Sequence, residues 1–146
     1  MEYIIRSASE LDASGINEVS EHLGYSQLSS TESTTKLQEL LNSTQDQVFV
    51  AEWQGRIIGW LHLFYARRLA SDNFFEIGGL VVSPESRGHG VGRALVQHAQ
   101  AKNLGKLRVR CNEKRLDAHK FYESIGRASG CGASRDFGWS TPRSCR

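Results

Sequence analysis

The chain has 146 residues and a formal net charge of +2, the size of a single domain that buries about 70% of its unfolded surface. This mild charge does not favour nucleic acid as a partner, and the lack of about 18 consecutive apolar residues argues against a membrane partner or a membrane span. Because the N-terminus lacks the basic start and apolar core of a signal peptide, and the three cysteines lack metal-ligand spacing, we expect a reduced, cytoplasmic protein without a metal site.

The N-terminal third predicts one strand and two helices. Residues Tyr3–Ser7 are typical of a first strand. A capping-box pattern begins at Ser9, and apolar residues then recur at near-helical spacing as far as Leu23. Polar residues over Ser26–Ser33 predict a loop, and Lys36–Leu41 carries a weaker helical pattern.

The middle of the chain predicts three consecutive strands. Two β-rich runs, Gln47–Trp53 and Arg56–Phe64, are joined at Gln54-Gly55, which is a strong hairpin signal. After a polar connection, Phe74–Val82 reads as a long apolar strand. Gly78-Gly79 interrupts it and predicts a bulge or the close approach of another backbone.

The most informative segment is Leu80–Arg93, with the sequence LVVSPESRGHGVGR. The strand stops at Ser83-Pro84, and a helical pattern over Gly92–Lys102 follows the glycines. Such a turn points several backbone N–H groups at one spot, beside the positive end of a helix dipole and with no Cβ in the way. An anion, above all a phosphate, is the expected ligand, with Arg87 and Arg93 adding positive charge. A plain glycine-rich turn is the alternative interpretation.

The C-terminal third predicts a strand, a helix and an unusual tail. Lys106–Cys111 alternates as a strand, and Leu116–Ile125 is an amphipathic helix. The resulting order, β-α-α-β-β-β-α-β-α, predicts a mixed α/β fold. From Gly126 to Arg146 there is no Val, Ile, Leu, Met or Tyr, so this segment can bury little to offset its ordering entropy. We expect a divergent or frame-shifted tail that pairs weakly with the sheet or not at all.

The turn Arg87-Gly88-His89-Gly90-Val91-Gly92 fits neither the dinucleotide fingerprint nor the Walker sequence. It resembles the R-x-x-G-x-G pyrophosphate signature of the GNAT superfamily of acyl-CoA-dependent N-acetyltransferases. The element order over residues 3–126 is also that of the GNAT fold, a mixed, mostly antiparallel sheet flanked by helices. The resemblance implies a GNAT domain over residues 1–126, an atypical Gly/Ser/Arg-rich tail over 127–146, and acetyl-CoA as co-substrate.

The resemblance also implies which residues bind acetyl-CoA. The glycine-rich turn would hold the pyrophosphate, the preceding strand end would bind the pantetheine arm through its backbone, and two later side chains would touch the cofactor. These residues are Leu80, Val81, Val82, Arg87, Gly88, His89, Gly90, Val91, Gly92, Arg93, Asn112 and Tyr122. A bulge at Gly78-Gly79 would splay the neighbouring strands and open the slot that the cofactor enters. For Asn112 a turn cap is the alternative interpretation.

Direct acetyl transfer to an amine needs a base for the amine proton and an acid for the leaving thiolate. Glu76 is the candidate base, because several GNAT members carry a Glu on this strand and its apolar neighbours would make it a better base near neutrality. Tyr122, in the segment DAHKFY, is the candidate acid. A partly exposed strand Glu and a core aromatic are the alternatives. Cys111 is interpreted as a small buried apolar residue, not a nucleophile.

The acceptor site implied by the resemblance lies between the first two helices and the central strands. Here that is His22–Gln27 and the strand faces near Trp53, Trp60, His62 and Tyr65. The acceptor would be a small-molecule or peptide amine, with aminoglycosides, polyamines and protein N-termini all open, and GNAT members often form homodimers. Two other functions remain: a catalytically weak or inactive acyl-CoA-binding regulatory module, and a generic binder of phosphate ligands.

Overall fold

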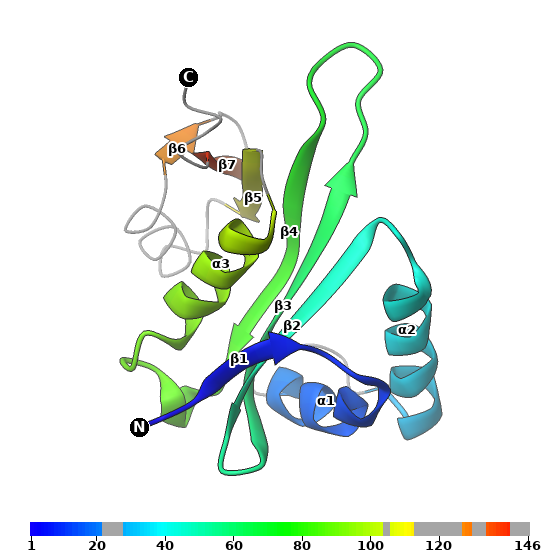
Figure 1. Cartoon of the computed structure of the whole chain (residues 1–146), viewed down its shortest axis with the longest axis vertical. Helices are drawn as coiled ribbons and strands as arrows, with labels where there is room; N and C mark the ends of the chain where they lie inside the picture. Colours follow the sequence, from blue (N-terminus) through cyan, green and yellow to red (C-terminus); the bar gives the residue numbers. More distant parts are fainter. Residues whose placement is uncertain (22–27, 104–105, 113–126, 130–133, 141–146) are drawn as a thin grey trace.

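A single sheet forms the centre of the molecule, with helices on both sides of it (Figure 1). The computed structural model describes residues 1–21, 28–103, 106–112, 127–129 and 134–140. Within these residues the sheet has seven strands in the order β1-β2-β3-β4-β5-β7-β6. All neighbouring strands are antiparallel except β4 and β5, which are parallel. The mixed, mostly antiparallel sheet predicted from the sequence is therefore confirmed.

The elements follow one another along the chain much as predicted. The strands are β1 (Ile4–Ser7), β2 (Asp46–Trp53), β3 (Arg56–Ala66), β4 (Phe74–Val82), β5 (Lys106–Asn112), β6 (Arg127–Ser129) and β7 (Ser134–Ser140). The helices are α1 (Ala13–Glu21), α2 (Ser30–Asn42) and α3 (Val91–Lys102), and two short 3-10 turns are η1 (Glu10–Asp12) and η2 (Pro84–Ser86). The predicted helix over Leu116–Ile125 lies outside the described residues.

Helix α2 starts earlier than its apolar pattern predicted. The side chain of Ser29 accepts a hydrogen bond from the backbone N–H of Glu32 at 3.1 Å and so caps the helix. The first turns are polar because they are largely exposed. Ser33 is the exception, since it is buried and its hydroxyl donates to the carbonyl of Ala13 at 3.1 Å. The expected loop over Ser26–Ser33 is therefore wrong from Ser30 onward.

Alternate residues of β2 belong to two apolar clusters, one on each face of the sheet. Phe49 and Ala51 pack with buried residues of α3, including Leu95, which has no exposed surface. Val48 packs instead with Ala13 of α1 and Leu37 of α2. Successive strand residues point to opposite faces, so α3 covers one face of the sheet, whereas α1 and α2 cover the other (Figure 1).

The tail adds strands to the sheet, contrary to the expectation from its composition. Ser134–Ser140 pairs with β5 along its full length, and β6 pairs with β7. Strand pairing uses backbone N–H and C=O groups, which every residue in this stretch supplies whatever its side chain. The two large apolar residues of the tail, Phe137 and Trp139, stand in register with Val109 and Leu107, which are both buried. The structure therefore contradicts an unpaired tail, whereas the strength of the pairing of β7 stays a prediction.

An ion pair ties the first strand to the start of α1. The guanidinium of Arg6 donates to both carboxylate oxygens of Asp12, at 2.8 and 2.9 Å, and the backbone N–H of Ser9 donates to the same carboxylate at 2.8 Å. The hydrogen bonds from Arg6 outweigh the effect of burial and hold the pKa of Asp12 below its usual value. This buried carboxylate therefore orients the turn η1, from which α1 begins.

We expect Asp12→Asn to lower the free energy of unfolding by about 2 kcal/mol at pH 7, because Arg6 loses the nearer of two carboxylate partners and keeps Glu52 at 3.3 Å. A carboxylate with a lowered pKa in the folded state stabilises above its ordinary pKa, and this contribution is lost as the pH falls through the folded-state value. The deficit of the variant should therefore shrink between pH 7 and pH 3. Urea unfolding at both pH values measures it, with Glu10→Gln, an exposed neighbour, as control. An equal deficit at both pH values would contradict the assignment.

Candidate active site

The exit from β4 is fixed by hydrogen bonds. The backbone N–H of Ser83 donates to the carbonyl of Ile58 at 2.8 Å, and the Ser83 hydroxyl donates to the hydroxyl of Ser86 at 2.9 Å. Both serines are buried, so these bonds satisfy polar groups that would be costly to bury alone. The turn η2 therefore sets the direction in which the chain leaves the sheet toward α3.

Two glycines give the following loop its shape. Gly88 and Gly90 have φ angles of +85° and +75°, in the left-handed region that other residues rarely adopt. Gly90 is the residue before α3 and supplies no side chain to cap the first N–H groups of the helix. Those groups and the positive end of the helix dipole form a site suited to an anion. The hydroxyl of Tyr3, the residue before β1, donates to the carbonyl of His89 at 3.1 Å and anchors the loop.

The loop is open to solvent, so a phosphate can reach it. Among the residues predicted to bind pyrophosphate, five are exposed, and they are Arg87, Gly88, His89, Gly90 and Arg93. The other two, Val91 and Gly92, are buried in the first turn of α3, so only their backbone can face a ligand. The structure thus brings these seven residues together around one helix start.

The strands β4 and β5 separate next to this loop. They pair at only three positions, the last of which joins Ile77 to Val109. Beyond that point β4 runs on to Val82 and β5 to Asn112 without pairing to each other. The edge of Gly78–Val82 that faces away from β3 therefore has no strand partner among the described residues, and its backbone groups can bond a ligand. This is the splay predicted from the sequence, and it includes Leu80, Val81 and Val82.

The predicted bulge lies at the start of the splay. Gly79 pairs with His62 of β3 and Ile77 pairs with Leu63, so Gly78 is the extra residue on β4. A Cβ on Gly78 would lie 2.8 Å from the His62 ring, and one on Gly79 would lie 2.7 Å from the Trp60 ring. The close approach at this point is therefore made by two aromatic side chains of β3, not by another backbone.

Glu76 lies on the face of the sheet that α1 and α2 cover. Its neighbours on β4, Phe75 and Ile77, pack against the core on the α3 side, so strand alternation places Glu76 on the opposite face. It is half-buried and pairs in register with Phe64, whose ring lies 5.9 Å from the ring of His62. Glu76 therefore shares a face with His62, close to where β4 and β5 separate.

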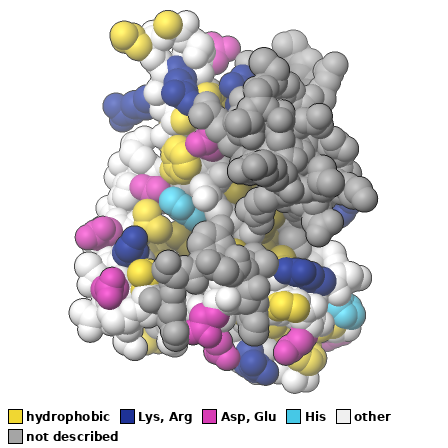
Figure 2. Space-filling model, turned by 180° about the vertical axis from the view of Figure 1, so that it is seen from behind, with side chains coloured by type: hydrophobic (Ala, Val, Ile, Leu, Met, Phe, Trp, Pro, Cys, Tyr) yellow, Lys and Arg dark blue, Asp and Glu magenta, His cyan; other side chains and the backbone are white. Residues whose placement is uncertain are grey.

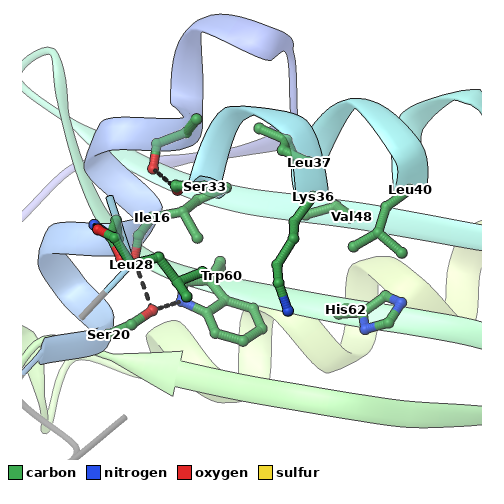
Figure 3. A pocket seen from close by; sticks show the side chains of 12 residues that line it. Ile16, Ser20, Leu28, Ser33, Lys36, Leu37, Leu40, Val48, Trp60 and His62 are labelled. Carbon is green, nitrogen blue, oxygen red and sulfur yellow. Dashed lines mark hydrogen bonds between the residues drawn. The ribbon is translucent and has the colours of Figure 1, made fainter. Parts of the chain in front are cut away.

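A cavity of about 410 Å³ lies on this same face, between α1, α2 and the strands β2 and β3 (Figure 3). Its walls are mainly apolar. They are formed by Ala13, Ile16, Asn17, Ser20, Leu28, Ser33, Lys36, Leu37, Leu40, Val48, Trp60 and His62. The indole N–H of Trp60 donates to the hydroxyl of Ser20 at 3.0 Å, which holds the ring in place as one wall of the cavity.

The imidazole of His62 is oriented by a carboxylate. Its Nε2 lies 2.8 Å from Oδ1 of Asp46 on β2. Burial by itself would raise the pKa of Asp46, but hydrogen bonds from His62 and Ser43 outweigh it, so that the pKa lies below its usual value. Because an ionised carboxylate only accepts hydrogen bonds, Nε2 carries a proton and Nδ1 can present its lone pair when the ring is neutral.

The structure corrects part of the predicted acceptor site. Trp60 and His62 line the cavity, and acceptor binding there stays a prediction. Trp53 instead packs against the core on the α3 side, and Tyr65 contacts Phe75, which packs on that same side. Strand alternation places these two residues away from the cavity. The segment His22–Gln27 lies outside the described residues.

Two other predicted site residues are not placed by the structure. Asn112 is the last residue of β5 and pairs in register with Ser134, but its side chain is not described. Tyr122 and the whole segment 113–126 lie outside the described residues. Their roles in binding acetyl-CoA and in catalysis therefore stay predictions.

The sequence profile described as the Acetyltransferase (GNAT) family matches residues 17–126. The chain belongs to this family. The matched residues include the bulged strand β4, the glycine-rich loop and the start of α3, which together form the candidate site. No curated protein matches the sequence significantly.

Solved structures share the GNAT fold with this chain at low sequence identity. An N-acetyltransferase from Staphylococcus aureus Mu50 superposes with a TM-score of 0.77 at 15% identity, over 96% of this chain and 99% of that one. PaiA N-acetyltransferase from Thermoplasma acidophilum, solved with coenzyme A, gives 0.76 at 16% identity, over 97% and 100%. An aminoglycoside acetyltransferase from an uncultured soil sample gives 0.73 at 22%, over 89% and 91%. These likenesses establish the fold.

Figure 2 shows one face of this GNAT protein. Acidic and basic side chains are interspersed on the described part of the face in Figure 2. Over the described residues, no cluster of three or more His, Cys, Asp or Glu side chains could hold a metal ion. In that part of the chain, no helix has the length and apolar character needed to cross a membrane.

Two residues of the site were missed in the sequence. Lys36 reads there as an ordinary polar position on a weak helix, and Asp46 as the residue before a strand. Lys36 lines the cavity only because α2 packs over the sheet, and Asp46 reaches His62, 16 positions away, only because β2 pairs with β3. The pattern that could have found Asp46 is its position two residues before Val48, on the same face of β2.

Proposed function

We propose that the protein transfers an acetyl group from acetyl-CoA to a primary amine. The observation that carries the proposal is the exposed loop Arg87–Gly90 at the start of α3, next to a strand edge that lacks a partner. The loop suits the pyrophosphate and the edge of Gly78–Val82 suits the amides of the pantetheine arm. Family membership and the fold support the same assignment.

In the proposed reaction both substrates are bound at once. The amine nitrogen attacks the thioester carbonyl, a C–N bond forms, and the C–S bond then breaks. Glu76 takes the proton that the amine loses, either directly or through one water molecule. Tyr122 would donate a proton to the leaving thiolate and Asn112 would contact the cofactor. The position of Glu76 supports its role, since it lies on the cavity side of β4 beside the splay.

A catalytically weak or inactive acyl-CoA-binding module is the second candidate. The tail favours it, because β7 pairs with β5 at the splayed part of the sheet and its composition is unusual for a closing strand. The two candidates differ in turnover, not in cofactor binding. Thiol released from acetyl-CoA in the presence of a panel of amines separates them, and a folded chain that binds acetyl-CoA without turnover supports the module.

Calorimetric titration with acetyl-CoA tests the cofactor site. We expect micromolar binding to the wild type and at least a tenfold loss of affinity in Arg87→Glu, because the reversal places a negative charge beside the pyrophosphate. Arg67→Glu is the matched control, since Arg67 is equally exposed but lies in the β3–β4 connection. Equal binding by Arg87→Glu and the wild type would remove Arg87 from the site, and no binding by the folded wild type would overturn the proposed function.

A further inference from the structure

Several polar side chains that line the cavity already form hydrogen bonds within the protein. The hydroxyl of Ser20 donates to the carbonyl of Ile16 at 2.7 Å and accepts from Trp60. The amide of Asn17 donates to the carbonyl of Leu28 at 2.9 Å, and Ser33 donates to Ala13. These hydrogen bonds join the walls of the cavity to one another, so the same groups have little hydrogen-bonding capacity left for a ligand.

The ammonium of Lys36 is the cationic group that the cavity leaves for a ligand. Its side chain runs from α2 toward the sheet, and its Nζ lies between Trp60 and His62 (Figure 3). Lys36 forms no ion pair with any residue that the structure describes. The carboxylate of Asp46 is bonded to His62, another residue of the lining. An anionic group of a ligand is therefore the natural partner of Lys36.

The described lining contains no Asp or Glu. A site for a polyamine or an aminoglycoside would need several carboxylates, because each buried ammonium of the ligand must be paired. The lining instead combines one lysine with the apolar side chains of Ile16, Leu37, Leu40 and Val48 and the ring of Trp60. Such walls suit a hydrocarbon or aromatic body.

The cavity also adjoins the proposed site of transfer. The ring of His62 forms part of its wall and lies against Gly78, the bulged residue of β4. Phe64, which contacts His62, pairs with Glu76. A molecule anchored at Lys36 can therefore extend along this face of the sheet toward the candidate base, where its amine would meet the thioester.

From these observations we propose that the acceptor is an amine that carries a carboxylate and an apolar side chain, with Lys36 as the carboxylate anchor. The single charge of Lys36 matches a carboxylate, whereas a phosphate dianion would keep half of its charge unpaired. That the ligand carries an amine rests on the proposed function. That it carries a carboxylate does not, since the carboxylate can bind at Lys36 without any reaction.

The experiment compares three amines as substrates, by thiol release with saturating acetyl-CoA. These are L-phenylalanine, L-phenylalaninamide (which lacks the carboxylate) and the polycation spermidine. We expect kcat/KM for phenylalanine to exceed that for its amide about tenfold or more, the size of one charge-assisted hydrogen bond. Lys36→Met should lower this ratio about tenfold or more, and Lys36→Arg should retain it. Lys36 is exposed on α2, so both variants should fold. A preference for spermidine, or a ratio unchanged in Lys36→Met, overturns the proposal.

A binding measurement separates this proposal from the proposed function. The probe is 3-phenylpropanoate, which has the carboxylate and the ring but no amine, and its binding is followed by calorimetry against 2-phenylethylamine. Tighter binding of the acid, lost in Lys36→Met, supports the anchor even if no amine is acetylated, in which case only the proposed function fails. Turnover of amines with equal binding of both probes leaves the proposed function standing and overturns the anchor.

Discussion

Removal of residues 128–146 is expected to lower the melting temperature by more than about 10 °C, which for this size corresponds to roughly 3–4 kcal/mol. The deletion removes β7 and most of β6, and so leaves β5 as the edge of the sheet. The backbone groups of β5 that pair with seven residues of β7 would then lose their partners. Thermal unfolding followed by circular dichroism measures the change.

A shorter deletion provides the control. A chain that ends at Ser140 keeps all seven strands and separates the contribution of the strands from that of the six residues after them. If the long deletion melts within about 2 °C of the wild type, β7 does not stabilise the sheet. The weak pairing expected from the composition of the tail would then describe the molecule in solution better than the register with β5.

The sequence was most informative where function and backbone geometry depend on the same residues. The loop Arg87–Gly92 carries glycines at positions with positive φ, so its conformation could be inferred from residue type alone. The bulge at Gly78 was predictable for a related reason, since a glycine inside a strand marks crowding or irregular pairing. In both places the local sequence contains the cause of the structure.

The sequence was least informative where the structure depends on backbone pairing or on packing between distant segments. The tail pairs through main-chain groups, which composition does not report. The start of α2 depends on the cap at Ser29 and on a contact between Ser33 and α1, neither of which produces an apolar period. The place of Lys36 in the wall of the cavity and the bond between His62 and Asp46 follow from how helix and strands pack, so no local pattern contains them.

Glu76→Gln is the substitution from which we expect the largest loss of activity. If Glu76 accepts the amine proton, its amide isostere should lower kcat by about 100-fold or more, because general bases contribute roughly 10² to 10⁴. Acetyl-CoA affinity should be unchanged, since the carboxylate lies on the face opposite α3 and its anion site. Stopped thiol-release assays give kcat, and calorimetry gives the cofactor affinity. Glu39→Gln, exposed on α2, is the matched control.

His62 lies on the same face of the sheet as Glu76 and is a second candidate base, which the experiment can tell apart from Glu76. His62 presents Nδ1 while Asp46 holds Nε2, which is the arrangement of an oriented imidazole base. If Glu76→Gln keeps its activity and His62→Gln loses it, the proton goes to the imidazole and Glu76 is a structural residue of β4. If both lose kcat while acetyl-CoA still binds, the double variant decides whether they act on one proton path, because losses on a single path do not add. If neither loses activity, the amine reaches the thioester already neutral and the site supplies orientation alone.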